Sequence, residues 1–181
     1  GSFVVAPRAP HGMRRWLLLI AAVTISAADW RQVSYGEEGW WEDHYSSLQS
    51  EGEAAEVWFS LPADALANYY NDYLGPDSQS TILLAQALVL GCGESNTTAA
   101  LASRREFDRI TCIDYSPAAI QFQKRNHDLS ISESSGGGRR FADVQFLIDD
   151  AEVLASQPNG SHTFVVDEGV LDCILCSMDQ A

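Results

Sequence analysis

The stretch Ala87-Leu-Val-Leu-Gly-Cys-Gly93 decides the fold class of this chain. A short apolar run enters a glycine turn, which is typical of a buried strand that ends sharply. Residues Thr97 to Ala102 follow with a helical pattern. Strand, tight turn and helix are the first half of a unit that builds parallel sheets.

A second unit follows directly. Arg109-Ile-Thr-Cys-Ile-Asp114 is an apolar strand that ends in an acid. Ser116 is a good N-cap and Pro117 suits the first helical turn, so we expect a helix over Ala118 to Asn126. The Ser-rich and Gly-rich stretch from Ser130 to Arg140 is expected to be a flexible loop.

Two further strands complete the pattern. They are expected at Val144 to Ile148, before Asp149-Asp150, and at Thr163 to Val166, before Asp167. A helix is expected to start at Leu171. The alternation predicts an α/β protein with a Rossmann-like parallel sheet flanked by helices.

Length and charge limit the classes of function. The chain has 181 residues, 46% of them hydrophobic, which suits one domain with its own core. The formal net charge of −14 disfavours nucleic acid and anionic lipid surfaces as partners. A basic or neutral protein partner fits this charge, although excess acid also serves solubility.

The N-terminal region allows several interpretations. Arg14-Arg15 precedes an apolar run from Trp16 to Ala28, as in a signal peptide, but the run is too short for a stable membrane span. We expect residues 1–34 to be a leader or tag, with an organelle-targeting leader or an N-terminal helix as alternatives, and residues 35–181 to form the domain.

The cysteines are expected to be reduced. They lie in or beside apolar runs, at Cys92, Cys112, Cys173 and Cys176. Reduced thiols predict a cytoplasmic protein, with organelle targeting through the N-terminal segment as the alternative. Cys173 and Cys176 form a C-x-x-C without a second pair at zinc spacing, so no metal site is predicted.

In an open parallel sheet, ligands bind beyond the carboxyl ends of the strands. Gly91 and Gly93 let the backbone approach a ligand there. A dinucleotide site would need a third small residue where this chain has Asn96, which disfavours NAD and FAD. S-adenosylmethionine (SAM) has no pyrophosphate, so two glycines suffice, and Glu94 or Asn96 is free to bond its amino and carboxyl groups or to order the turn.

Acids end the other strands. Asp114 is placed to accept the ribose hydroxyls of a nucleoside, and Asp149 or Asp150 to accept the exocyclic amine of adenine. Asp167 is a candidate to hold the ammonium of the methionine moiety or a substrate amine. For each acid the alternative is a simple turn or helix cap.

Three segments resemble the seven-stranded, class I protein lysine methyltransferases, and within these the group that modifies translation elongation factor 1 alpha. They read Leu88-Val-Leu-Gly-Cys-Gly-Glu-Ser, Cys112-Ile-Asp-Tyr-Ser and Val166-Asp-Glu-Gly-Val-Leu-Asp-Cys-Ile. Trp40-Trp-Glu-Asp-His-Tyr45 is similar to that group's early aromatic signature, and Val57-Trp-Phe59 to its aromatic pair.

The resemblance implies that Gly91, Gly93, Asp114 and Asp150 contact SAM, with Asp167 near its methionine end. Tyr115, which follows Asp114 in the second segment, is also expected to contact SAM. The aromatic side chains are candidates for a substrate channel, with core or lid packing as the alternative. These aromatic residues are Trp40, Trp41, Tyr45 and Trp58.

The chain also departs from the resemblance. Glu168 and Val170 stand where the group typically has lysine and threonine, which affects substrate choice. The family's fifth strand and terminal hairpin would follow beyond Ala181, so we expect an incomplete fold with an exposed sheet edge, and an oligomer through that edge.

The expected function is a SAM-dependent methyltransferase that modifies a protein lysine, with a translation elongation factor as a candidate substrate. The residues single out no catalytic group, because the enzyme mainly positions the reactants and desolvates the amine. The alternatives are an inactive SAM-binding or regulatory fragment and a small-molecule methyltransferase.

Overall fold

The computed structural model describes residues 2–5, 17–22, 38–51, 85–104, 107–134 and 142–178. Its centre is a sheet of six strands in the order β1-β2-β6-β3-β4-β5. The strands are β1 (Ser2–Val5), β2 (Leu17–Ala22), β3 (Ala85–Leu90), β4 (Phe107–Asp114), β5 (Asp143–Ile148) and β6 (Phe164–Asp167).

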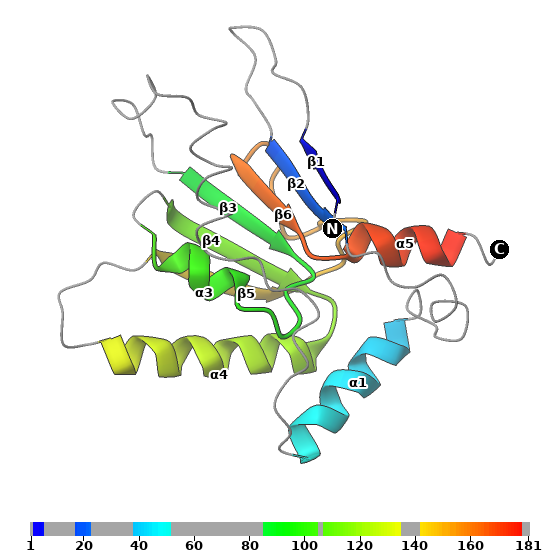
Figure 1. Ribbon diagram of the computed structural model, residues 1–181, viewed down its shortest axis with the longest axis horizontal. Coiled ribbons are helices and arrows are strands. Elements are labelled where there is room, and N and C mark those ends of the chain that lie inside the picture. The colour runs from blue at the N-terminus through cyan, green and yellow to red at the C-terminus, as the bar shows by residue number, and fades with distance from the viewer. Residues whose placement is uncertain are drawn as a thin grey trace, which may run out of the picture.

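Helices flank this sheet. Figure 1 shows α3 and α4 beside β4 and β5, with α1 near the start of α4 and α5 leaving the end of β6. Their bounds are α1 (Glu38–Glu51), α3 (Thr97–Ala102), α4 (Pro117–Ser134) and α5 (Val170–Met178). The predicted α/β class with a parallel sheet flanked by helices is confirmed.

The four strands predicted from the sequence pair in parallel. β3 lies between β6 and β4, and β4 in turn pairs with β5. Ala87, Leu88 and Val89 of β3 are all buried, as expected for a central parallel strand covered on both faces. In β5 only partly buried and exposed side chains occur, which fits its place at the edge.

The sequence did not predict the structure of the N-terminal segment. Leu17–Ala22 forms β2, which pairs in parallel with β6, so the alternative of a helix there is wrong. The sheet thus takes strands from both sides of the expected boundary at residue 34. A role for this segment in targeting stays a prediction.

The pairing of β2 also corrects the expected sheet edge. β6 has a strand on both sides, β2 and β3, because the apolar N-terminal segment satisfies the backbone groups that would otherwise be open. β6, the last described strand in the sequence, is therefore not an edge of the described sheet, whose edges are β1 and β5. An oligomer through a sheet edge stays a prediction.

Helix α4 is longer than predicted. Ser116 caps it as expected, since its Oγ accepts a hydrogen bond from the N–H of Ala119 at 3.1 Å. The helix continues to Ser134, so the first residues of the stretch expected to be a loop are helical. Of the described helices, none is long and apolar enough to cross a membrane.

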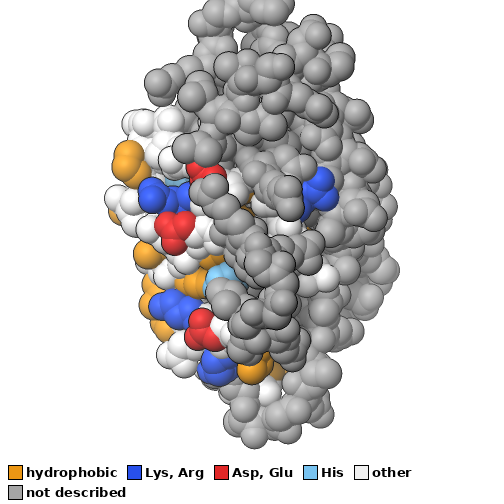
Figure 2. Space-filling model, turned by 90° about the vertical axis from the view of Figure 1, so that its left-hand side faces the viewer, with side chains coloured by type: hydrophobic (Ala, Val, Ile, Leu, Met, Phe, Trp, Pro, Cys, Tyr) orange, Lys and Arg blue, Asp and Glu red, His pale blue; other side chains and the backbone are white. Residues whose placement is uncertain are grey.

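The end of the sheet at which β4 and β5 begin has mixed charge. Arg109 and Asp143 form an exposed ion pair at 3.2 Å between β4 and β5. Figure 2 shows Lys and Arg side chains among Asp and Glu side chains on the described part of the face it presents. Exposed pairs of this kind stabilise a fold by at most about 1 kcal/mol.

A disulfide joins Cys92, in the turn after β3, to Cys112 in β4. The expectation that these two thiols are reduced is wrong, because pairing of β3 with β4 brings the two cysteines to a Cα–Cα distance of 6.2 Å, within the range of a disulfide. Cys173 is not part of a disulfide, as expected.

We predict that alkylation in denaturant without reductant leaves Cys92 and Cys112 unmodified, and that both are labelled after reduction. Reduction should lower the free energy of unfolding by about 3 kcal/mol, because the bond closes a loop with a sequence separation of 20. Mass spectrometry of the peptides and urea titrations measure the two effects. Labelling of both cysteines before reduction would contradict the disulfide.

Candidate cofactor site

The carboxyl ends of the parallel strands meet at one end of the sheet, where Figure 1 shows the arrowheads of β3 to β6 pointing the same way. Backbone hydrogen bonds continue across the loops: Gly91 N–H donates to Ile113 O at 2.9 Å and Glu168 N–H to Leu90 O at 3.1 Å. The segments that follow these strands therefore have fixed positions relative to one another. We call residues 91–96 the glycine turn.

Both glycines of this turn have a positive φ, 65° at Gly91 and 39° at Gly93. Side chains of the chain itself also fill the space that a Cβ would need, Val170 at Gly91 and the Tyr45 hydroxyl at Gly93. Glycine is therefore required at both positions, as predicted. The groups that approach the two glycines in the structure are the side chains of Val170 and Tyr45, whereas the prediction was a ligand.

Asp114 ties the glycine turn to the start of α4. One carboxylate oxygen accepts a hydrogen bond from Gly93 N–H at 3.0 Å and the other from Ser116 N–H at 2.9 Å. The side chain is only 6% exposed. Burial raises the pKa of Asp114 to about 6, and the backbone hydrogen bonds partly oppose this rise.

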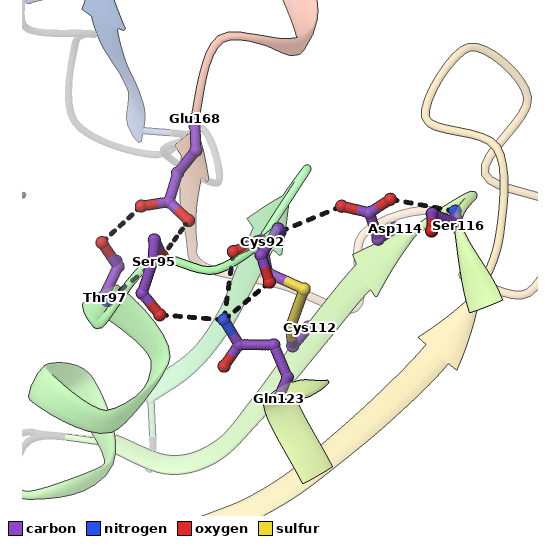
Figure 3. Close-up of a disulfide and its surroundings, with 9 residues drawn as sticks. Cys92, Ser95, Thr97, Cys112, Asp114, Ser116, Gln123 and Glu168 are labelled. Atoms are coloured by element: carbon purple, nitrogen blue, oxygen red, sulfur yellow. Dashed lines mark hydrogen bonds between the residues drawn. A yellow bond between two sulfur atoms is a disulfide. The ribbon is translucent and has the colours of Figure 1, made fainter. Parts of the chain in front are cut away.

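Glu168, at the end of β6, holds the same turn from another direction. Its carboxyl group accepts hydrogen bonds from the hydroxyls of Ser95, at 2.6 Å, and Thr97 (Figure 3). Burial raises the pKa of Glu168 to about 8, more than these hydroxyls lower it, and the charges of Asp167 and Asp114 raise it further. The raised pKa favours the protonated form of Glu168.

Two other acids have a buried oxygen to which no described group donates a hydrogen bond. They are Glu94, in the turn, with Oε2, and Asp167 with Oδ2. The other oxygen of Asp167 accepts from Leu171 N–H at 3.3 Å. Burial raises the pKa of both, that of Asp167 to about 6. Buried acceptors without a partner are uncommon in proteins and fit a cationic ligand.

The acids after β5 differ in their surroundings. Asp149 accepts hydrogen bonds from the backbone N–H of Ser156 at 2.9 Å and from its hydroxyl, and this bonding lowers its pKa. Asp149 therefore anchors a loop. Asp150 is exposed at the same end of the sheet, and one of its oxygens accepts from Glu152 N–H at 2.8 Å. Of the two, Asp150 is the better placed for a ligand.

Helix α1 brings the N-terminal aromatic residues to this end of the sheet. Trp41 stacks on Tyr45 with ring centroids 5.8 Å apart, and both pack on Ala118 and Ala119 of α4. Trp40 stacks on His44 at 5.1 Å. Trp41 thus packs between helices, while Tyr45 also borders the glycine turn. Trp58 lies outside the described residues.

Glu42 attaches α1 to the start of α4. It accepts hydrogen bonds from the Ser116 hydroxyl at 2.5 Å and from Ala118 N–H at 3.3 Å. A carboxylate at this position satisfies a free donor and the positive end of the helix. Because Glu42 and Tyr45 share a helix, this contact helps to fix the aromatic ring beside Gly93.

Tyr45 is close to several residues of the candidate site. Burial raises its pKa above the ordinary value, and the charges of Asp114, Glu94 and Tyr115 add to the shift. Asn96, in contrast, is exposed and makes no side-chain cap bond to α3. The structure thus brings most of the predicted residues together and leaves Asn96 at the surface.

Comparison with known proteins identifies the family of this part of the chain. Residues 88–180 match a family described as "Methyltransferase domain", so the match contains the glycine turn, Asp114 and Glu168. The chain belongs to the methyltransferase domain family. No solved structure matches it significantly.

A curated relative agrees with this assignment. The chain is 28% identical over 142 residues to EEF1A lysine methyltransferase 2 from Homo sapiens. The alignment covers 78% of this chain and 53% of the relative, so the chain spans about half the length of that protein. The resemblance inferred from the sequence segments is confirmed at the level of the methyltransferase family, and the similarity to this relative agrees with the group named there.

Several residues that shape this methyltransferase site were missed as site residues from the sequence. They come from elements distant in the sequence and act on the turn or on α4: Glu42, Ser95, Thr97, Gln123 and Glu168. Glu168 was noticed only as a departure from the family pattern. Its position directly after Asp167, at the end of a buried strand, was the available signal, because a buried acid needs donors.

We predict that Glu168→Gln flattens the dependence of stability on pH. In the unfolded chain the pKa of Glu168 returns to about 4.5, so its stabilising proton is fully present below that pH and is lost as the pH rises through about 8. The amide stays neutral. The free energy of unfolding of the variant, measured by urea titration, should therefore fall less between pH 6 and pH 9 than that of the wild type.

A matched control is Glu152→Gln, since Glu152 is exposed in the loop after β5. This variant should keep the pH dependence of the wild type. An identical pH dependence in Glu168→Gln and the wild type would contradict the assignment of a proton to Glu168.

Proposed function

We propose that this chain binds SAM at the glycine turn and transfers its methyl group to a lysine of a protein. The observation that carries the proposal is the buried Asp114. Its two oxygens accept backbone hydrogen bonds from Gly93 and Ser116, and a carboxylate has further acceptor positions that suit the hydroxyls of a ribose.

The surroundings of Asp114 fit the rest of SAM. Asp150 is the candidate partner of the adenine amine, and Tyr115 lies next to Asp114 in the chain. Glu94 and Asp167 each have a buried oxygen suited to the ammonium of the methionine moiety. The carboxyl groups gathered here favour a cofactor whose sulfonium and ammonium groups are both positive.

The chemistry needs little beyond positioning. When bound, SAM supplies an electrophilic methyl group on a positively charged sulfur. The substrate amine would have to be neutral, with its proton lost to solvent, so that its lone pair can take the methyl group that SAM would supply. This chain would hold the two reactants in line and exclude water, with Tyr45 and the buried acids around them.

The proposal of a protein lysine as substrate rests on two supports. The similar human protein is named as a lysine methyltransferase of EEF1A, which makes a translation elongation factor the first substrate to test. The net charge of −14 also favours a lysine-rich, basic partner over an acidic one. Asp167 is the candidate to attract the substrate amine if Glu94 takes the ammonium of SAM.

We predict that Asp114→Ala abolishes measurable SAM binding in isothermal titration calorimetry at pH 7.5, because the ribose loses its acceptor. Asp143→Ala, at the opposite end of the sheet, is the matched control and should bind SAM like the wild type. Equal affinity of Asp114→Ala and the wild type would rule out the site.

Binding should also depend on pH. Protonation of Asp114, with a pKa of about 6, replaces an acceptor by a donor, so SAM affinity should fall as the pH drops from 7.5 to 5. Titrations at four pH values measure this, and an affinity that increases toward pH 5 would be inconsistent with a carboxylate acceptor.

Transfer is tested with methyl-labelled SAM and purified elongation factor 1 alpha, or with proteins and metabolites of a cell lysate. We expect label in protein that is released as methyl-lysine after hydrolysis, and none with Asp114→Ala. Label in metabolites would favour a small-molecule methyltransferase, and SAM binding without any transfer would favour a binding or regulatory role.

A further inference from the structure

Gln123, in α4, contacts the glycine turn at three points. Its Nε2 lies 3.1 Å from the carbonyl oxygen of Cys92, 3.0 Å from that of Gly93 and 2.8 Å from that of Ser95. The side chain is 4% exposed. Figure 3 shows the amide below the turn, with the three carbonyl oxygens directed toward it.

This arrangement has a clear energetic reason. Carbonyl groups that turn into a buried region need a donor, and leaving one without a partner costs about 1–3 kcal/mol. The primary amide has two hydrogens, which the three oxygens share. Cys92 O also accepts a hydrogen bond from Ser95 N–H at 3.0 Å. Gln123 is therefore a second donor to Cys92 O and the donor that the described residues provide for Gly93 O and Ser95 O.

The same bonds also orient the turn. A carbonyl oxygen carries partial negative charge, and a ligand carboxylate beside it would be repelled. With the oxygens of Cys92, Gly93 and Ser95 drawn toward α4, the negative ends of these dipoles are held on the α4 side of the turn.

Glu168 and Asp114 complete the restraint. Glu168 fixes the Ser95 and Thr97 hydroxyls from the β6 side, and Asp114 fixes Gly93 N–H. Gln123 supplies the contact from α4 and acts on the backbone oxygens. The turn is thus held by side chains from β4, α4 and the end of β6.

We propose that Gln123 is a positioning residue for the amino-acid end of SAM: it keeps the carbonyls of the glycine turn away from the methionine carboxylate. This inference rests on the proposed function. Because Gln123 acts through the turn, its removal should weaken ligands that carry the amino-acid end and spare those that lack it.

The experiment compares two ligands by isothermal titration calorimetry. SAM carries the amino and carboxyl groups, whereas 5′-methylthioadenosine has the same nucleoside without them. The variant Gln123→Met keeps the length of the side chain and removes the donor. Gln121→Met, on an exposed position of the same helix, is the matched control.

We expect Gln123→Met to bind SAM about tenfold more weakly than the wild type, the loss that about 1.4 kcal/mol produces. Its affinity for 5′-methylthioadenosine should be unchanged, and Gln121→Met should bind both ligands like the wild type. If Gln123→Met fails to fold, Gln123→Glu tests the same bonds, because it keeps the shape and places an oxygen opposite the carbonyls.

Three results would overturn the inference. An unchanged affinity for SAM, or an equal loss for both ligands, would show that Gln123 only supports the fold, while the wild type would still bind SAM as proposed. Failure of the wild type to bind SAM would instead overturn the proposed function, and the inference with it.

Discussion

The site depends on one buried carboxylate. Asp114 ends β4 and accepts hydrogen bonds from Gly93 N–H in the turn after β3 and from Ser116 N–H before α4. The first of these bonds joins residues 21 positions apart in the chain. Together with Gln123 of α4, which bonds the carbonyl oxygens of the turn, Asp114 fixes the glycine turn relative to the capped start of α4. Glu42 of α1 binds the same helix start.

Acidic side chains converge on this point at a cost. Burial raises the pKa of Asp114, Asp167 and Glu168, so each would be easier to ionise in the unfolded chain. Buried acids with raised pKa values of this kind are common at functional sites, where they lower the stability of the fold. Glu168 avoids part of the cost by holding its proton and bonding Ser95 and Thr97, whereas Asp167 keeps a buried oxygen to which no described group donates.

The sequence predicted the local elements well. Apolar runs that end in glycine or acid identified β3 to β6, and Ser116-Pro117 identified the start of α4, because strand burial and helix capping are encoded over a few neighbouring residues. Gln123 and Glu42 were not predicted as site residues. Their partners lie 28 to 31 and 74 to 76 positions away, respectively, and a helix sequence does not indicate which distant loop its polar residues face. The Cys92–Cys112 pair and the pairing of β2 with β6 were missed for the same reason, since both follow from the lateral order of strands.

The central claim is that the methyltransferase site is organised around Asp114, and a crystal structure with bound S-adenosylhomocysteine tests it most directly. The account predicts both ribose hydroxyls within hydrogen-bond distance of Asp114, the adenine beside Asp150 and the amino-acid end over the glycine turn. A ligand bound elsewhere, or a ribose without contact to Asp114, would contradict it.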